Sequence, residues 1–371
     1  MKKRFLKDKN FGVPHGMQRG ADEGLSLRAL RKWGMGTHSF LSLYKDVEHF
    51  RKVGQESFIP FVETDKFILV AGEPVAEPDE MLELLRGLKR LAVNRKKTLG
   101  LLPSREMPAQ VTEALCLDRV YIGQEPVFDL QREANYGKSI RQAICRAKKL
   151  GISVGEFSPA GDVLGADRRA IQALCKRWSG SRELPPMQFL FALNPLALAE
   201  HKRIFLAKDA SGNVIAMLAC SPIFGRNGWY LEDLLRGAEA PNGTTELLVT
   251  SVLELLRNDG YDMATLALAP LAGLSNHDDA HPWLNKLMRL AYKRLSFVYH
   301  FETLEYFKGK FKPDFWEPNY FYFYPQGVKL GLVDGLARAF LGDGIFSVVR
   351  HKFGLWTGRD ESDERERKVV S

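Results

Sequence analysis

An acidic and a basic residue, Asp233 and Arg236, lie three positions apart at the end of a predicted strand that begins near Trp229. A carboxylate can hold an ammonium group through a charge-assisted hydrogen bond, and a planar guanidinium suits phosphate or carbonyl oxygens. Side chains alternate along a strand, so these two can serve one site only if the strand ends or bulges between them. The alternative is a structural ion pair.

A turn, Ala240-Pro241-Asn242-Gly243, follows this strand and precedes a strongly periodic helix. Asn242 and Gly243 offer N-cap chemistry at the start of that helix. A helix N-terminus beside a strand end commonly binds anionic groups. Asn242 and Gly243 are therefore candidate substrate-binding residues.

Three lysines, Lys308, Lys310 and Lys312, occupy alternate positions near the end of the chain. In an extended segment all three side chains would face one way and form a phosphate clamp. The alternative is a solvated edge that discourages strand pairing.

A predicted helix over residues 136–151 carries the densest positive charge. Its apolar residues fall on one stripe, and the opposite arc is basic. The basic residues are Lys138, Arg141, Arg146, Lys148 and Lys149. This arc is either a contact surface for the phosphates of tRNA or a solvated helix face.

Metal and disulfide chemistry have little support in the sequence. His277 and His281 are four residues apart, a metal-ligand spacing, but they lie in a polar loop, so no metal site is predicted. The cysteines are well separated and form no Cys-x-x-Cys pair, which favours reduced thiols in the cytosol. They are Cys116, Cys145, Cys175 and Cys220.

The 371 residues carry a net charge of +8, which favours an anionic partner such as nucleic acid, an anionic membrane surface or a phosphate-bearing substrate. No apolar run is long enough for a transmembrane helix, and no apolar segment follows the basic N-terminus as in a secretory signal. A basic amphipathic pair of helices over residues 328–358 could lie on an anionic membrane, dock on its own domain or form a dimer contact.

The elements expected around these residues form two α/β units in succession. The first contains strands over 58–62 and 66–71, a helix over 78–94, a strand over 99–103 and a loop over 120–130. The second contains a helix over 167–178, a hairpin over 203–208 and 214–222, the strand of Asp233, its helix, a buried strand over 263–274, and a last strand over 320–324.

The predicted domain boundaries follow this order. A mobile basic N-terminus covers 1–22, the first unit 23–160 and the second unit, with the active site, 161–327. Amphipathic helices cover 328–358, and a charged tail covers 359–371. The expected fold class is α/β (α+β), with mixed sheets flanked by helices.

Five segments together carry a family resemblance: residues 233–236, 240–244, 268–271, 307–313 and Trp316-Glu317. The chain resembles the cytosolic catalytic domain of the phosphatidylglycerol lysyltransferases and alanyltransferases, the multiple peptide resistance factor family, from about Thr37 to Tyr324. It would be a stand-alone soluble form of that domain. One departure is Glu73, which stands where the family has the aspartate of a Gly-Asp-Pro motif.

The resemblance implies two tandem acetyltransferase-like (GNAT) folds and transfer of an aminoacyl group from aminoacyl-tRNA to a lipid hydroxyl, with phosphatidylglycerol as the first candidate. It favours catalytic roles for Asp233, Arg236 and Lys310. The further substrate-binding candidates are Lys308, Lys312, Tyr299, Glu305 and Glu317. It also implies anionic phospholipid as a partner and a cytoplasmic protein. Peripheral contact with the inner membrane face and a separate membrane flippase are left open.

Two other functions stay open. One is an acyl-CoA-dependent N-acyltransferase of the same fold, but the glycines of Arg236 to Thr244 are too far apart to cradle pyrophosphate, so neither CoA nor another cofactor is predicted. The other is a non-catalytic module that binds tRNA or anionic lipid. The sequence leaves open which amino acid is transferred, the acceptor hydroxyl and the oligomeric state.

Overall fold

The computed structural model describes residues 12–180, 193, 195–274 and 301–327, apart from residues 21 and 46. Apart from residues 179 and 180, the elements below lie in the unit that contains residues 1–178 and 193–326. Tyr299, His277, His281 and the predicted helices over 328–358 lie outside the described residues.

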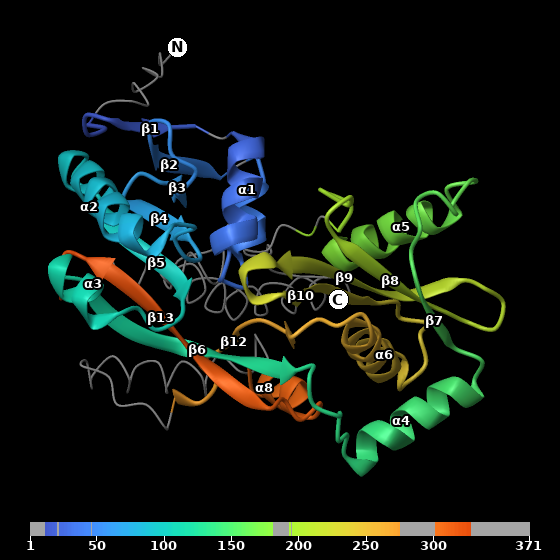
Figure 1. Cartoon of the computed structure of the whole chain (residues 1–371). Coiled ribbons are helices and arrows are strands. Elements are labelled where there is room, and N and C mark those ends of the chain that lie inside the picture. Colours follow the sequence, from blue (N-terminus) through green and yellow to red (C-terminus); the bar gives the residue numbers. More distant parts are fainter. Residues whose placement is uncertain are drawn as a thin grey trace, which may run out of the picture. The chain divides into compact units, whose positions relative to one another are not determined.

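Thirteen strands in the described ranges form one mixed sheet, in the order β1-β2-β3-β4-β5-β13-β6-β11-β10-β9-β8-β7, with β12 beside β6 (Figure 1). The strands are β1 (Met17–Arg19), β2 (Glu48–Lys52), β3 (Phe58–Glu63), β4 (Phe67–Ala71), β5 (Thr98–Ser104), β6 (Asp118–Asp129), β7 (Ser153–Glu156), β8 (Arg203–Lys208), β9 (Val214–Ile223), β10 (Gly228–Arg236), β11 (Met263–Thr265), β12 (Ala269–Pro270) and β13 (Phe315–Tyr324).

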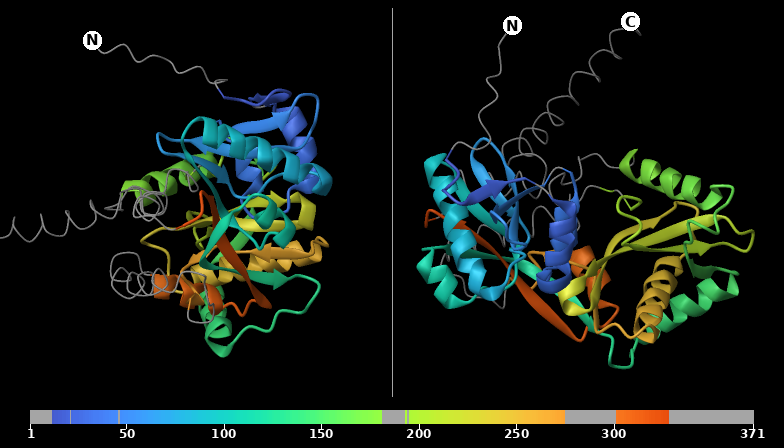
Figure 2. Two further views of the ribbon diagram at one scale, coloured as in Figure 1. Left: turned by 90° about the vertical axis from the view of Figure 1, so that its left-hand side faces the viewer. Right: turned by 45° about the horizontal axis from the view of Figure 1, so that its top comes forward.

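Helices flank this sheet, as Figures 1 and 2 show. They are α1 (Glu23–Trp33), α2 (Pro78–Asn94), α3 (Ala109–Ala114), α4 (Lys138–Lys149), α5 (Ala166–Gly180), α6 (Thr244–Asn258) and α8 (Phe301–Gly309), with short 3-10 helices η1 (Ser39–Leu43) and η2 (Phe224–Arg226). The mixed sheet flanked by helices confirms the predicted α/β (α+β) class.

One order of elements occurs twice along the chain. In the first half, β4 leads through α2 to the parallel strand β5. In the second half, β10 leads through α6 to the parallel strand β11. Antiparallel strands precede each of these βαβ units. This repeat is the tandem acetyltransferase-like layout expected from the sequence.

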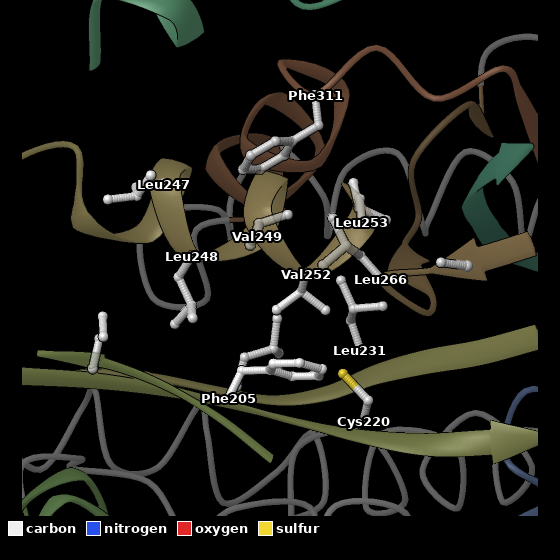
Figure 3. Close-up of a cluster of buried hydrophobic side chains, with 14 of the residues drawn as sticks. Phe205, Cys220, Leu231, Leu247, Leu248, Val249, Val252, Leu253, Leu266 and Phe311 are labelled. Carbon is white, nitrogen blue, oxygen red and sulfur yellow. The ribbon is translucent and has the colours of Figure 1, made fainter. Parts of the chain in front are cut away.

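The second half has a hydrophobic core on each face of its sheet. Phe205 of β8 packs with Leu248 and Val252 of α6, and Figure 3 shows these side chains directed toward one another. Its neighbours along the strand, Ile204 and Leu206, belong to the opposite core together with residues of α5. Because alternate residues of a strand face opposite sides, α5 and α6 cover opposite faces of β8 to β10.

The two halves share strands. Strand β13 lies between β5 and β6, although it is the last described strand of the chain. Strand β6 pairs with β13 on one side and with β11 on the other. Strand β7, which precedes residue 160, pairs with β8. The division into domains at residue 160 stays a prediction. The segments before and after this residue contribute neighbouring strands to one sheet.

The loop predicted over residues 120–130 is wrong, because this segment is most of strand β6. Gly123 and Pro126 suggested a loop, but both have a place in the strand. A Cβ atom on Gly123 would lie 2.4 Å from the carbonyl oxygen of Ala269, so glycine permits β12 to approach β6 here.

Candidate active site

The parallel strands β10 and β11 diverge in the second half. They pair from Gly228 opposite Met263 to Tyr230 opposite Thr265, and then β11 ends. The chain kinks at Ala267, whose φ is +59°, and returns as β12 beside β6. Strand β10 continues to Arg236 with β9 as its partner. Among the described strands, none pairs with β10 on its other side beyond Tyr230.

The equivalent strands of the first half stay together. Strands β4 and β5 pair through five positions, as far as Ala71 opposite Leu102. Beyond them, Glu73 accepts two hydrogen bonds from the Arg105 guanidinium, at 2.9 and 2.8 Å. This ion pair links the ends of the two strands, so only the second half has the divergence.

A β-bulge lies where β10 leaves β11. Leu231 is opposite Cys220 and Asp233 is opposite Ala219, so Glu232 is the extra residue. Bulges redirect side chains and are frequent beside active sites. The bulge lies before Asp233 and not between Asp233 and Arg236, so these two side chains still face opposite sides of the strand.

Arg236 lies on the face of β10 toward α6. Its guanidinium donates hydrogen bonds to the carbonyl oxygen of Ala240, at 3.2 and 2.5 Å, and to Oδ1 of Asn242, at 3.3 Å. It thereby holds the turn before α6. Gly243, at the N-cap with φ +100°, has no room for a side chain, because a Cβ atom would lie 2.4 Å from the carbonyl oxygen of Ala143 on α4.

Four polar side chains from separate parts of the chain meet beside Asp233. Lys202 Nζ lies 2.8 Å from Oε2 of Glu232, with side chains 0% and 6% exposed. Lys202 also donates to the hydroxyl of Tyr44 at 2.8 Å, and that hydroxyl donates to Glu232 Oε1 at 3.4 Å. Ser221 donates a further hydrogen bond to Glu232. Glu232 is therefore fully engaged with its neighbours.

The electrostatics of this group favour a bound cation. Burial lowers the pKa of Lys202, but Glu232 and Tyr44 outweigh it and raise the pKa, so Lys202 is charged. Burial and the nearby Glu232 raise the pKa of Asp233 to about 7. Asp233 Oδ2 is buried and has no hydrogen-bond partner within the described part of the chain. A buried acceptor of this kind is costly unless a ligand donates to it.

A second polar cluster adjoins the kink between β11 and β12. Lys308 Nζ donates to the carbonyl oxygens of Ala267 and Leu268, at 2.9 and 2.8 Å. Thr37 Oγ1 donates to Oε2 of Glu125 at 2.6 Å. Burial raises the pKa of Glu125 to about 7 and lowers the pKa of Lys308 to about 7. Lys308 therefore fixes the kink that separates the two strands.

Tyr230 connects the two clusters. Burial raises the pKa of its hydroxyl well above the ordinary value, and the carboxylates of Glu232, Asp233 and Glu125 add to that effect. Its ring lies 5.3 Å from the ring of His38. The carboxylates of both clusters thus act on one side chain.

The three lysines near the end of the chain do not form the predicted extended clamp. Lys308 is in helix α8, which ends at Gly309, and its side chain is buried. Lys310 Nζ lies 2.6 Å from Glu246 in the first turn of α6. Lys312 is exposed at φ +54°. Helix and turn geometry therefore send the three side chains to different surroundings.

The remaining predicted residues are distributed over several elements. Glu317 of β13 lies 2.8 Å from Arg226 and 4.0 Å from Arg105, which places it in the ion network that includes Glu73. Glu305 is half-buried in α8.

The basic residues of α4 lie on one exposed surface. Lys138, Arg141, Arg146, Lys148 and Lys149 are all exposed. An open depression of about 500 Å³ is lined by Arg141, Ile144, Cys145, Lys148 and Lys149. The opposite stripe of α4 is buried against the core that contains α6.

Sequence reasoning missed Glu232, Lys202, Tyr44, Thr37 and Glu125. Only Glu232 left a visible signal, since it and Asp233 are consecutive acids in an otherwise apolar strand. The others come together through tertiary contacts. In the described residues, no group of histidines, cysteines and acids could hold a metal ion, and no helix is long and apolar enough to cross a bilayer.

Comparisons with known proteins agree on one family. A family model described as "Phosphatidylglycerol lysyltransferase, C-terminal" matches residues 28–323. The lysylphosphatidylglycerol biosynthesis bifunctional protein LysX of Mycobacterium ulcerans is 26% identical over 286 residues, which are 74% of this chain and 25% of the relative. The phosphatidylglycerol lysyltransferase of Bacillus subtilis is 24% identical over 151 residues, 40% of this chain and 17% of the relative. The chain thus spans a quarter or less of these relatives.

Two solved structures share the fold. The structure of L-PGS from Bacillus licheniformis has a TM-score of 0.70 at 18% identity and covers 86% of this chain and 97% of its own. The C-terminal domain of a lysylphosphatidylglycerol synthetase from Agrobacterium fabrum has a TM-score of 0.69 at 17% identity and covers 85% and 96%.

Proposed function

Because the chain belongs to the phosphatidylglycerol lysyltransferase C-terminal family, we propose that it transfers an aminoacyl group from aminoacyl-tRNA to a hydroxyl of phosphatidylglycerol. The observation that carries this proposal is the buried Oδ2 of Asp233 at the divergence of β10 and β11, which has no hydrogen-bond partner among the described residues. An aminoacyl ester carries an α-ammonium group, which is the cationic donor that this oxygen lacks.

In the proposed reaction, the lipid hydroxyl attacks the ester carbonyl carbon of the aminoacyl-tRNA. A new ester bond forms to the lipid, the bond to the terminal ribose of the tRNA breaks, and the proton of the attacking hydroxyl ends on the ribose oxygen. The donor is already activated, so the protein must mainly position the reactants and stabilise charge. Asp233 orients the ammonium, and Lys202 and Tyr44 hold Glu232 beside it.

Roles for the other candidates follow from their positions. Arg236 and Asn242 hold the turn before α6, so we assign them to positioning that turn. Lys310 forms an ion pair with Glu246 of α6. Lys312 is exposed and can meet a phosphate of the tRNA or the lipid. The exposed arc of α4 is proposed as the tRNA contact.

An acyl-CoA reaction has less support. A CoA pyrophosphate would need free backbone N–H groups at the start of α6. Here the first of those N–H groups, the amide of Thr244, already donates to the carbonyl of Pro241 at 3.2 Å.

The test is an in vitro transfer assay. The purified protein is incubated with a mixture of labelled aminoacyl-tRNAs and vesicles that contain phosphatidylglycerol, and the lipids are extracted and separated. Labelled phosphatidylglycerol is expected with the unchanged protein. Retained binding of tRNA and vesicles without any labelled lipid would instead favour a non-catalytic binding module. Contact with a membrane through residues 328–358, a peripheral location at the inner membrane face and a flippase partner stay predictions.

A further inference from the structure

The loop between β7 and α5 carries two neighbouring aliphatic residues at its tip. Val163 and Leu164 are 87% and 81% exposed, the highest exposed fractions of any large hydrophobic side chain in the described residues. Single exposed hydrophobic residues are common on protein surfaces. Two adjacent ones leave most of their apolar area in water, which favours contact with another apolar surface. The loop lies at the outer end of α5 (Figure 1).

Contacts within the loop and the helix hold this tip in place. The carboxylate of Asp162 accepts hydrogen bonds from the backbone amides of Asp167 and Arg168, at 3.1 and 2.9 Å, and so caps the N-terminus of α5. Arg169 Nη1 donates to the carbonyl oxygen of Leu164 at 2.7 Å. Because these polar groups already have partners, the tip can leave water at a lower cost than an unstructured loop.

The charges beside the tip favour an anionic surface. Arg168 and Arg169 are exposed in the first turn of α5. Asp167 is neutralised by Lys208, whose Nζ lies 2.8 Å from its carboxylate. Asp162 is the one acid of the loop itself. Two arginines and one aspartate leave a net charge of +1 at the tip, since Asp167 and Lys208 cancel.

We infer that Val163 and Leu164 insert into the surface of an anionic bilayer and hold the protein there. A protein partner fits less well, because a stable protein interface buries about 800 Å² on each partner and two aliphatic side chains expose far less. Insertion needs only a few apolar side chains at the acyl boundary, with cations nearby to meet the lipid phosphates. The choice of a lipid surface rests on the proposed function, because phosphatidylglycerol is itself an anionic bilayer lipid.

Helix α5 connects this tip to the proposed site. Asp233 is paired with Ala219 and, like that residue, faces the core that contains α5. Burial and the carboxylate of Asp233 raise the pKa of Cys175 on α5 to about 11, so this thiol lies near Asp233. From Ala166 to Cys175 the helix rises about 14 Å. Contact at the tip therefore brings the site close to the lipid headgroups.

The first experiment measures sedimentation of the full chain with vesicles of phosphatidylglycerol and phosphatidylcholine. Replacement of Val163 and Leu164 together by aspartate should lower binding to the vesicles by on the order of tenfold. Replacement of Val53 and Val93 by aspartate is the matched control, because both are exposed valines and the added charge is the same. Equal binding by the two double variants would overturn the inference.

The second experiment detects insertion directly. Leu164→Trp adds one tryptophan to the six of the unchanged protein. Its added emission should shift to the blue on vesicles and be quenched by brominated acyl chains, whereas that of Val53→Trp should not. Absence of quenching in vesicle-bound Leu164→Trp would overturn insertion. Unchanged vesicle binding together with a lower mass of the aspartate variant in ultracentrifugation would assign the tip to a second copy of the chain instead.

The third experiment separates the inference from the proposed function. Transfer from aminoacyl-tRNA is measured with phosphatidylglycerol in vesicles and with a short-chain phosphatidylglycerol dissolved as monomers. The aspartate variant at Val163 and Leu164 should be slower by on the order of tenfold on dilute vesicles and unchanged on the monomers. An equal loss on both forms would overturn the inference. Absence of product from the unchanged protein on either form would overturn the proposed function, and vesicle binding would still test the tip.

Discussion

Asp233 is predicted to support activity and to lower stability. A buried carboxylate can bind a substrate ammonium, but its ionised form also destabilises the folded state. The pKa of Asp233 is raised from 3.8 to about 7 by burial and by Glu232. The folded state thus binds this proton more tightly than the unfolded state does. The resulting stabilisation is complete below the unfolded pKa and is lost as the pH rises through 7.

Replacement of Asp233 by asparagine should therefore raise stability and lower activity. At pH 8 we expect Asp233→Asn to be more stable than the unchanged protein by roughly 1–3 kcal/mol, an advantage that shrinks as the pH falls toward 4. Transfer should slow by on the order of 10²-fold. Thermal melts across this pH range and single-turnover transfer on the same preparations provide the test.

Glu239→Gln is the matched control for this variant, because Glu239 is an exposed acid in the loop after β10. It should change neither the pH profile of stability nor the rate. Full activity in Asp233→Asn would remove Asp233 from the proposed site.

Lys308 provides a prediction about stability. Lys308→Met removes the donor to the carbonyls of Ala267 and Leu268, and each buried carbonyl left unsatisfied costs about 1–3 kcal/mol. The kink between β11 and β12 should loosen, so transfer should fall together with the melting temperature. Lys312→Met, an exposed change four residues away, should leave stability unaltered. A melting temperature as high as that of the unchanged protein would contradict the proposed role of Lys308.

At the scale of elements, the sequence predicted the bounds of a helix correctly where the hydrophobic periodicity and a helix-breaking residue indicated the same position. The helix predicted over 78–94 has these bounds as α2, since Pro78 occupies its first turn and its leucines recur at helical spacing. Strand β6 was missed because its glycine, proline and acids are typical of a loop, while its neighbours β13 and β12 come from distant parts of the chain. The bulge at Glu232 depends on the register with β9 and has no sequence signal.

Helix α4 carries a prediction about tRNA. Reversal of Arg141, Lys148 and Lys149 to glutamate alters the exposed arc and leaves the buried residues Ile140 and Ala147 in place. Binding of tRNA should weaken, and its dependence on salt should flatten, because fewer phosphate counterions are released. Titrations at several salt concentrations measure both effects.

The control for α4 is a reversal of two exposed arginines on another helix. Arg86 and Arg90 are exposed on α2, and their replacement by glutamate should leave tRNA affinity nearly unchanged at a matched ionic strength. If the α4 variant bound tRNA as tightly as this control at low salt, the basic arc would be a solvated helix face.

At the scale of the whole molecule, the insertion of β13 makes the two halves interdependent. Strands β5 and β6 have β13 between them and pair with it along much of their length. The sequence predicted the aromatic strand near Tyr324, but its destination in the first half depends on pairing across the chain. A prediction from the order of elements along the chain assigns this strand to the second half, in which it occurs.

Removal of β13 should therefore unfold the first half of the chain as well as the second. A chain that ends at residue 314 leaves β5 and β6 with exposed edges and lacks Tyr320 and Tyr322, which belong to the hydrophobic core of the first half. We expect it to lose its cooperative thermal transition and to aggregate. A chain that ends at residue 327 keeps every described strand and serves as the control. A cooperative transition in the shorter chain would contradict the interdependence of the halves.

The position of β13 also constrains when the complete sheet can first form during translation. A ribosome that has completed β6 must synthesise nearly all of the second half before β13 emerges, which takes roughly 10 to 40 seconds at common elongation rates. Until then β5 and β6 have no neighbour between them, and Glu317 is absent from its network with Arg105 and Arg226. The network of Glu317 thus forms only after every residue of the group beside Asp233 has been synthesised.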